Sequence, residues 1–182
     1  METSTHAVWI ENTTSKFDHG GPGWEFGSCV WSPAKDRRAV EGRYKIMREV
    51  QAGDLFINCY DGVITGTSKA KGRCTTVKER PPNPGPWAYA SSFHRIELEA
   101  YQPAVKKETL NHVALMFREK IRDEIESSHP TYYLFSWWPI TEFHPKGRLV
   151  LSQGRFLARS TPLLTDCISK LAGIELLGIG LS

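Results

Sequence analysis

The chain has 182 residues, of which 40% are hydrophobic and 24% charged, and its formal net charge is +3. This length and composition are typical of one folded domain and exclude a chain that is mainly disordered. We expect a cytoplasmic protein with reduced thiols, because the sequence lacks a membrane-spanning apolar run, a signal peptide and closely spaced cysteines.

Residues 6–12 predict the first strand, which is rich in β-branched and aromatic residues and ends at a polar turn. A loop rich in glycine and aromatic residues follows over 13–28, and a short apolar segment spans 29–33. We expect a helix over 36–50, because apolar residues recur there on one helical face: Val40, Tyr44, Met47 and Val50.

Two further strands are expected at 55–59 and 63–70, on either side of Asp61-Gly62, a dipeptide typical of hairpin turns. Residues 81–87 hold four of the 11 prolines. They predict an irregular loop, because proline donates no hydrogen bond to a strand ladder. Another strand is expected over 93–101.

The clearest helix covers 107–127, where apolar residues recur every three or four positions. An aromatic segment at 129–140 and a short strand at 149–152 follow it. A last helix begins at Thr161-Pro162, with threonine as the cap and proline at the first helical position, and ends at Gly173.

Short strands and two or three helices in mixed order predict an α+β fold, a small mixed β-barrel decorated by helices. We expect this fold to form a single domain over 1–173. Residues 174–182 are then a tail or the beginning of a further segment.

The sequence contains no Gly-x-Ser-x-Gly, no His-Glu-x-x-His and no Gly-rich phosphate-binding loop. Its six histidines show no metal-ligand spacing. We therefore expect a binding module rather than an enzyme, without a metal or a cofactor.

Positive charge is concentrated in three segments, residues 35–48, 69–80 and 146–159. They form either one face for a polyanion or three separate solvated surfaces, and charge alone leaves both interpretations open. Phosphate contacts give affinity and salt dependence but little sequence information. The candidate phosphate-binding residues are Lys35, Arg37, Arg38, Lys69, Lys71 and Arg73.

The order of these segments resembles the PUA-like superfamily, and within it the EVE domain, over residues 6–160. The matching elements are Cys-Val-Trp-Ser-Pro at 29–33, Gly-Asp-Leu-Phe at 53–56, Val-Ile-Thr-Gly at 63–66 and a strand ending in Tyr-x-Pro at 101–103. Residues 152–157 resemble a C-terminal barrel strand of such domains. The sequence is also similar to the related YTH domains and to the DNA-reading modules of McrB-type modification-dependent restriction systems.

The resemblance implies a reader that flips a modified base, with DNA favoured, into an aromatic cage. Val30-Trp31-Ser32 looks like the YTH element whose tryptophan forms one wall of such a cage. A nuclease or NTPase partner would act elsewhere in the chain or in another subunit. The candidate base-pocket residues are Trp31, Ser32, Asn12, Asn58, Trp87, Tyr89 and Phe93.

Each of these residues also has a purely structural interpretation. The tryptophans fit a core equally well, and the asparagines fit strand ends and turns. Three other functions stay open: an RNA-modification reader of the same fold, a small ASCH-like hydrolase acting on modified nucleosides, and a protein-interaction domain. The hydrolase would need an acid–base pair such as Glu25 with Lys69, and the interaction domain would need an exposed apolar patch.

Overall fold

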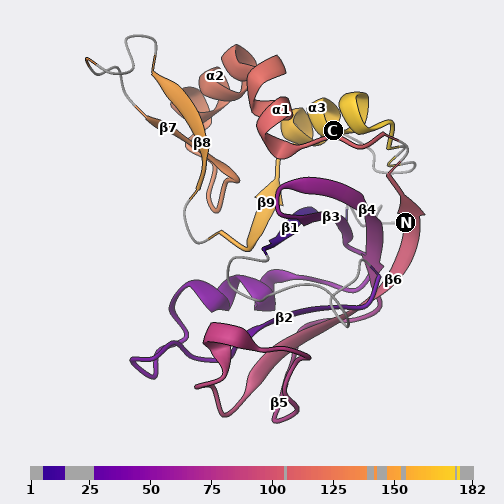
Figure 1. The fold of residues 1–182 in the computed structure, drawn as a ribbon, viewed down its shortest axis with the longest axis vertical. Coiled ribbons are helices and arrows are strands. Elements are labelled where there is room, and N and C mark those ends of the chain that lie inside the picture. The colour runs from indigo at the N-terminus through magenta and orange to yellow at the C-terminus, as the bar shows by residue number, and fades with distance from the viewer. Residues whose placement is uncertain are drawn as a thin grey trace, which may run out of the picture.

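The structure, a computed structural model, describes residues 6–14, 27–104, 106–138, 142, 147–152, 155–174 and 176. Its centre is a curved mixed sheet in the order β2-β6-β4-β3-β1-β9, with β5 paired to β6 (Figure 1). The β1–β3 pair is parallel and the other pairs of this sheet are antiparallel. The strands are β1 (Val8–Thr13), β2 (Cys29–Pro33), β3 (Leu55–Tyr60), β4 (Val63–Ala70), β5 (Thr75–Val77), β6 (Phe93–Pro103) and β9 (Leu157–Ser160).

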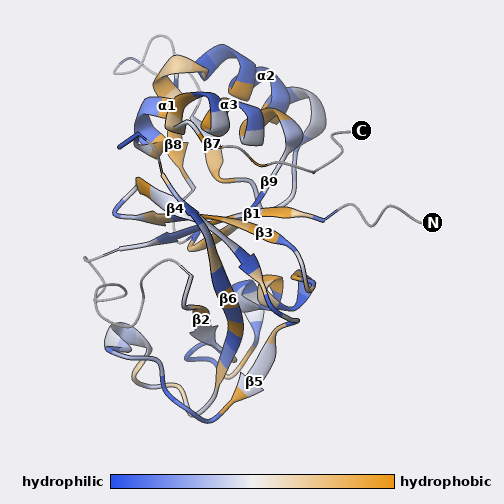
Figure 2. Cartoon of the chain, turned by 90° about the vertical axis from the view of Figure 1, so that its right-hand side faces the viewer, coloured by the Kyte–Doolittle hydropathy of each residue, from blue (hydrophilic) through white to orange (hydrophobic). Residues whose placement is uncertain are grey.

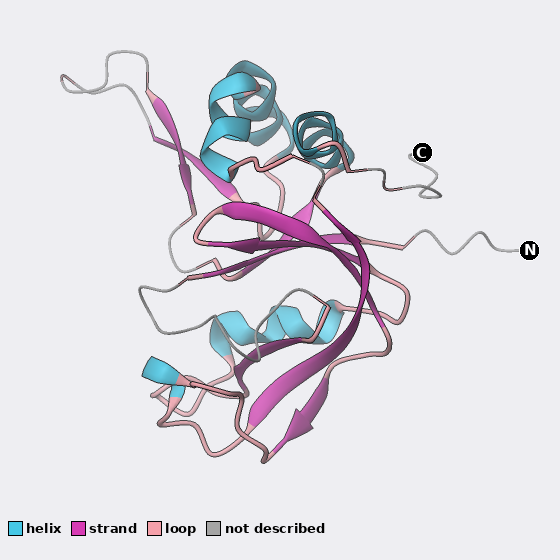
Figure 3. Ribbon diagram, turned by 45° about the vertical axis from the view of Figure 1, so that its right-hand side comes forward, coloured by secondary structure: helices cyan, strands magenta, loops and turns pink. Residues whose placement is uncertain are grey.

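A separate two-stranded ribbon pairs β7 (Phe135–Trp138) with β8 (Arg148–Leu151). Three α-helices lie together at one end of the molecule: α1 (Leu110–Met116), α2 (Arg118–Ser128) and α3 (Pro162–Ala172) (Figure 3). Two 3-10 helices lie at the other end, η2 (Gly42–Glu49) and η3 (Gly85–Trp87). Every helix in the described part of the chain is too short or too polar to cross a membrane.

Alternation along β1 and β3 divides the core between the two faces of the sheet. Val8 and Ile10 of β1 join the cluster that packs against α1 and α3, whereas Trp9 lies in the cluster with Met47 of η2. Figure 2 shows these apolar strands between the helices and the rest of the barrel. The α-helices thus form a layer that packs on one face of the sheet, while the η2 end carries the loop after β2 and the proline-rich loop.

A buried carboxylate joins the beginning of β1 to the turn before β3. Asp54 accepts hydrogen bonds from the backbone amide of Ala7 (3.0 Å), the indole of Trp9 (2.8 Å) and the backbone amide of Gln51 (2.9 Å). The Gly-Asp element before this strand therefore has a structural purpose, because it supplies the acceptor that the buried indole needs.

Several sequence predictions are confirmed. The Asp61-Gly62 turn joins β3 and β4, with φ of 49° and 75° at its two residues. The side chain of Thr161 caps α3 by accepting from the backbone amide of Leu164 (3.2 Å), and Gly173 ends the helix with φ 66°. The expected α+β architecture, a mixed barrel-like sheet decorated by helices, is also confirmed.

Two helix predictions were wrong in extent. The segment expected to be helical over 36–50 becomes helical only at Gly42, because the Asp36 side chain binds the backbone amides of Arg38 and Val40 and Ala39 has φ 60°. The helix expected over 107–127 is divided at Phe117, whose φ of −115° and ψ of 23° leave the helical region. This break lets α1 pack against β8 and α3 while α2 packs against β7.

Strands β2, β5, β7 and β9 were not predicted as such, and residues 29–33, which form β2, were expected only as a short apolar segment. The segment 152–157, expected to be a strand, joins the sheet only at Leu157, and its residues 153–154 lie outside the described residues. Ile174 is buried against the helical cluster. The boundary at 173 stays a prediction, because residues 177–182 also lie outside the described part.

Candidate functional site

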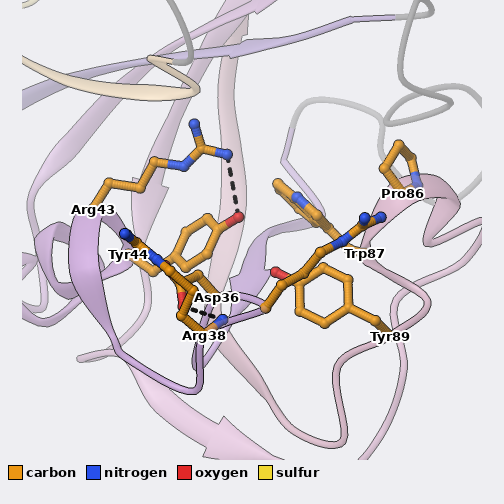
Figure 4. Close-up of a pocket in the computed structure, with 8 residues that line it drawn as sticks. Asp36, Arg38, Arg43, Tyr44, Pro86, Trp87 and Tyr89 are labelled. Carbon is orange, nitrogen blue, oxygen red and sulfur yellow. Dashed lines mark hydrogen bonds and ion pairs between the residues drawn. The ribbon is translucent and has the colours of Figure 1, made fainter.

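A pocket of about 270 Å³ opens at the η2 end of the molecule, between the loop that follows β2 and the proline-rich loop (Figure 4). The first loop and η2 supply a carboxylate, three arginines and one aromatic ring, and the second supplies a proline and two aromatic rings. The lining residues are Asp36, Arg37, Arg38, Arg43, Tyr44, Pro86, Trp87 and Tyr89. The sequence prediction included Arg37, Arg38, Trp87 and Tyr89, and the structure brings these four together.

Asp36 fixes the shape of the first loop. Its carboxylate accepts from the backbone amides of Arg38 (2.8 Å) and Val40 (3.2 Å) and pairs with the Arg38 guanidinium (3.1 Å). Desolvation alone would raise the pKa of this carboxyl, but the hydrogen bonds from Val40 and Arg38 outweigh it and lower the pKa. Asp36 is therefore ionised and engaged, which suits a loop anchor rather than a general base.

Three rings in mutual contact, Tyr44, Trp87 and Phe156, form the ring wall, of which Tyr44 and Trp87 line the pocket and Phe156 does not. Trp87 meets Tyr44 at 6.1 Å between ring centroids with an interplanar angle of 83°, and meets Phe156 at 5.9 Å and 79°. Tyr44 and Phe156 are 6.0 Å apart. The two edge-to-face contacts of Trp87 contribute about 0.5–1.5 kcal/mol each beyond burial and so stabilise this wall. Tyr44 and Trp87 are almost fully buried.

Tyr89 forms the exposed side of the pocket, with 40% of its surface accessible. The Arg37 guanidinium lies 5.3 Å from the centre of its ring, and its hydroxyl donates to the Lys35 carbonyl (3.4 Å). Burial, and then the nearby Tyr44 hydroxyl, raise the pKa of Tyr89 to about 12. The phenol is therefore neutral at physiological pH and offers an uncharged ring.

On the side of the pocket opposite Tyr89, Arg43 and Tyr44 form a second cation–ring pair (Figure 4). The Arg43 guanidinium lies 5.2 Å from the centre of the Tyr44 ring and donates to its hydroxyl at 3.3 Å (Figure 4). The pocket thus has aromatic sides with arginines around them. This arrangement can hold a flat aromatic ligand that carries or adjoins negative charge.

The predicted cage residue Trp31 lies behind the ring wall and does not line the pocket. It is 5% exposed and packs in one cluster with Tyr44, Trp87 and Phe93. The Arg95 guanidinium lies 5.6 Å from the centre of its ring and pairs with Glu79 at 2.9 Å. Trp31 and Phe93 therefore support the pocket, and a direct contact of either with a base stays a prediction.

The predicted polar residues of the cage lie away from this pocket. Ser32 is buried and donates to the Pro33 carbonyl (3.2 Å). The Asn12 side-chain oxygen accepts from the Gly62 amide at 2.9 Å, so Asn12 closes the β3–β4 turn. These contacts agree with the structural interpretation of both residues.

Asn58 belongs to a buried polar network. Its amide donates to Glu11 (2.6 Å) and accepts from the Ser68 hydroxyl (2.5 Å). Burial raises the pKa of Glu11 to about 7, although the hydrogen bond from Asn58 opposes this. Both ends of the Asn58 amide are thus bound within the barrel.

The predicted phosphate-binding residues fall into two groups. Arg37 and Arg38 line the pocket, and Lys35 lies beside it through its bond to Tyr89. The second group is exposed at the end of β4 and in the loop that follows, and does not line the pocket: Lys69, Lys71 and Arg73.

Sequence reasoning missed four residues of the pocket and one of its supporting wall: Asp36, Arg43, Tyr44, Pro86 and Phe156. Tyr44 was interpreted as part of an apolar helix face, which is correct for its burial but does not show that it lines the pocket. A signal that could have found it is the Arg43-Tyr44 pair itself, since a guanidinium beside a ring often stacks on it. Within the described ranges, no three His, Cys, Asp or Glu side chains lie close enough to hold a metal ion.

Comparison with solved structures identifies the fold. The structure of Rpa0253 from Rhodopseudomonas palustris matches with a TM-score of 0.51 at 13% identity, covering 94% of this chain and 95% of that one. The crystal structure of Atu2648 from Agrobacterium tumefaciens matches with a TM-score of 0.52 at 9% identity, covering 92% and 94%. Both are EVE-domain proteins. This chain has the EVE type of PUA-like fold.

The EVE-type fold confirms the resemblance seen in the sequence. No protein-family model matches the chain, and no curated protein sequence is significantly similar to it. Human THYN1, in a structure with DNA that contains 5-methylcytosine, matches with a TM-score of 0.48 at 11% identity over 93% of this chain and 99% of that one. That likeness is too distant to carry an argument about a ligand here.

Proposed function

We propose that this EVE-type domain binds nucleic acid and recognises a modified base, which it flips out of the helix into the pocket between Trp87 and Tyr89. The observation that carries this proposal is the combination of ring surfaces and arginines around one small pocket. At about 270 Å³, the pocket is slightly below the range of about 300–1,000 Å³ that is usual for drug-sized ligands. Its size therefore suits a single base.

The energetics of flipping explain why aromatic walls are needed. Unstacking and unpairing a base cost a few kcal/mol. Stacking on aromatic side chains returns about 1–3 kcal/mol per base. A buried methyl group adds only about 0.8 kcal/mol, a factor of about four, so higher selectivity requires a closely fitting wall. The packed rings of Tyr44, Trp87 and Phe156 support such a wall.

DNA is favoured over RNA by the resemblance to the modules of restriction systems. In this proposal the domain itself does no chemistry, and a nuclease or NTPase acts elsewhere in the chain or in another subunit. Binding is favoured over hydrolysis because Asp36, the carboxylate of the described pocket, is fully engaged by Val40 and Arg38. Of the acid–base pair considered for a hydrolase, Glu25 lies outside the described residues and Lys69 does not line the pocket.

The test is binding to matched duplexes that differ in one base: unmodified, N6-methyladenine, 5-methylcytosine and 5-hydroxymethylcytosine. The same series in RNA and a turnover assay with modified nucleosides separate the alternatives. Tighter binding of one modified DNA duplex, with quenching of tryptophan fluorescence, supports the proposal, since Trp87 lines the pocket. Equal binding of all duplexes, or turnover of a nucleoside, contradicts it.

A further inference from the structure

In its described part, the third basic segment of the sequence carries three stacked guanidinium groups. Arg148 lies 4.7 Å from the ring centre of Trp138, Arg155 lies 5.4 Å from that of Tyr132, and Arg159 lies 5.9 Å from that of Trp9. We call Arg148, Arg155 and Arg159 the arginine row. Stacking on a ring holds a guanidinium in place while its N–H edge stays available to an anion.

The arginine row lacks carboxylate partners. Within the described residues, none of its three members forms an ion pair with Asp or Glu. By contrast, four other arginines each lie within 3.1 Å of a carboxylate oxygen: Arg38 at Asp36, Arg48 at Glu41, Arg95 at Glu79 and Arg122 at Glu119. Within the described residues, positive charge is therefore left uncompensated along this segment, as it is at Arg37 and Arg43 of the pocket.

Arg155 is the clearest case of a positive charge without a partner among the described residues. Its side chain is half-buried, and its Nε atom is buried without a hydrogen-bond partner in the described structure. Burial lowers the pKa of its guanidinium, and the Coulombic interaction with Tyr132 offsets this only in part. A partly buried cation without an anion is costly, and a bound anion would remove that cost.

One member of the arginine row, Arg155, lies next to the ring wall in the chain. Phe156, the residue after Arg155, has its ring centre 6.0 Å from that of Tyr44 and 5.9 Å from that of Trp87, so Arg155 directly precedes a residue of the ring wall. Arg148 lies at the other end, on the β7–β8 ribbon opposite Trp138, which is 50% exposed. The ribbon and the loop before η2 extend from the same side of the molecule in both views (Figures 1 and 3).

We propose that the arginine row binds backbone phosphates of the nucleic acid whose base enters the pocket. The inference rests on the proposed function for the nature of the anion, and it extends the contact surface from the pocket to the β7–β8 ribbon. Guanidinium groups bind phosphate oxygens with two parallel hydrogen bonds, and the row offers three such groups. Because phosphates carry no base identity, the row supplies affinity rather than preference.

The test compares the salt dependence of duplex binding for three variants, measured with a modified and an unmodified fluorescent duplex. The first variant is Arg148→Gln with Arg159→Gln, both at exposed positions, and the second is Arg155→Gln. The control is Arg122→Gln, because Arg122 also stacks on a tryptophan (Trp137, 5.7 Å) but is already paired with Glu119 and Asp123.

Each lost phosphate contact should reduce the slope of log K against log salt by about 0.9. We expect a reduction of about 1.8 for the double variant and about 0.9 for Arg155→Gln, equally on both duplexes, and no change for Arg122→Gln. An unchanged slope in the double variant overturns the inference, even if Arg155→Gln fails to fold. Wild-type protein that binds both duplexes equally would refute the base-reader proposal alone, whereas no binding at low salt would refute both.

Discussion

Replacement of Tyr89 by alanine tests the pocket without disturbing the core. The side chain is 40% exposed, and its hydroxyl makes a long 3.4 Å bond to the Lys35 carbonyl beside the Tyr44 hydroxyl, so the cost in stability should be small. If a base stacks on this ring, Tyr89→Ala should lose about 1–3 kcal/mol of binding to the preferred duplex. This loss corresponds to a dissociation constant about 5- to 150-fold higher.

The matched control is Tyr89→Phe, which keeps the ring and removes only the hydroxyl. Fluorescence anisotropy with the preferred and the unmodified duplex measures both variants, and thermal melting checks that they remain folded. We expect Tyr89→Phe to bind within about threefold of wild type, because a long exposed hydrogen bond contributes little. Wild-type affinity in Tyr89→Ala would refute the stacking argument, and an equal loss in Tyr89→Phe would assign the effect to the hydroxyl.

The remaining predictions concern the core, the buried network and the second basic group. Trp31→Ala should lower the free energy of unfolding by about 3–5 kcal/mol in denaturant, because Trp31 is buried behind the ring wall; wild-type stability would show that it does not support the pocket. The pKa of Glu11 is raised from 4.5 to about 7 by burial, so the folded state keeps a proton that the unfolded state releases between these values. The free energy of unfolding should therefore fall by about 3 kcal/mol from pH 4.5 to 7, and identical pH profiles for wild type and Glu11→Gln would contradict this. Lys69→Ala with Lys71→Ala should weaken binding to all duplexes and reduce the salt slope, and an unchanged slope would place this group off the interface.

The parts of the fold that could be predicted are those governed by local chemistry. Asp61-Gly62 accepts the left-handed turn that joins β3 and β4, and Thr161, Pro162 and Gly173 bound α3 through caps that act within a few residues. The break at Phe117 could not be predicted, because no glycine or proline marks it in the sequence. It accompanies the packing of α1 against β8 and of α2 against β7.

Only part of the pocket could be predicted from the sequence, because only some of its residues lie in a locally recognisable segment. Trp87 and Tyr89 stand out in the sequence because they lie at or just after the proline-rich loop. The expectation of an irregular loop over 81–87 was wrong at Gly85–Trp87, which form the short 3-10 helix η3. Trp31 was placed in the site by resemblance, but its register on β2 points it into the cluster behind the wall. Tyr44 and Phe156 come from segments far apart in the chain and meet only in the folded barrel. No local pattern could reveal that contact.

The most direct test of the central claim is a crystal structure of the domain with the duplex that it binds most tightly. The account predicts that the modified base is extrahelical, stacked in the pocket between Trp87 and Tyr89, with the flanking backbone toward the arginine row. A base that stays paired within the duplex, or that occupies another part of the barrel, would contradict the account.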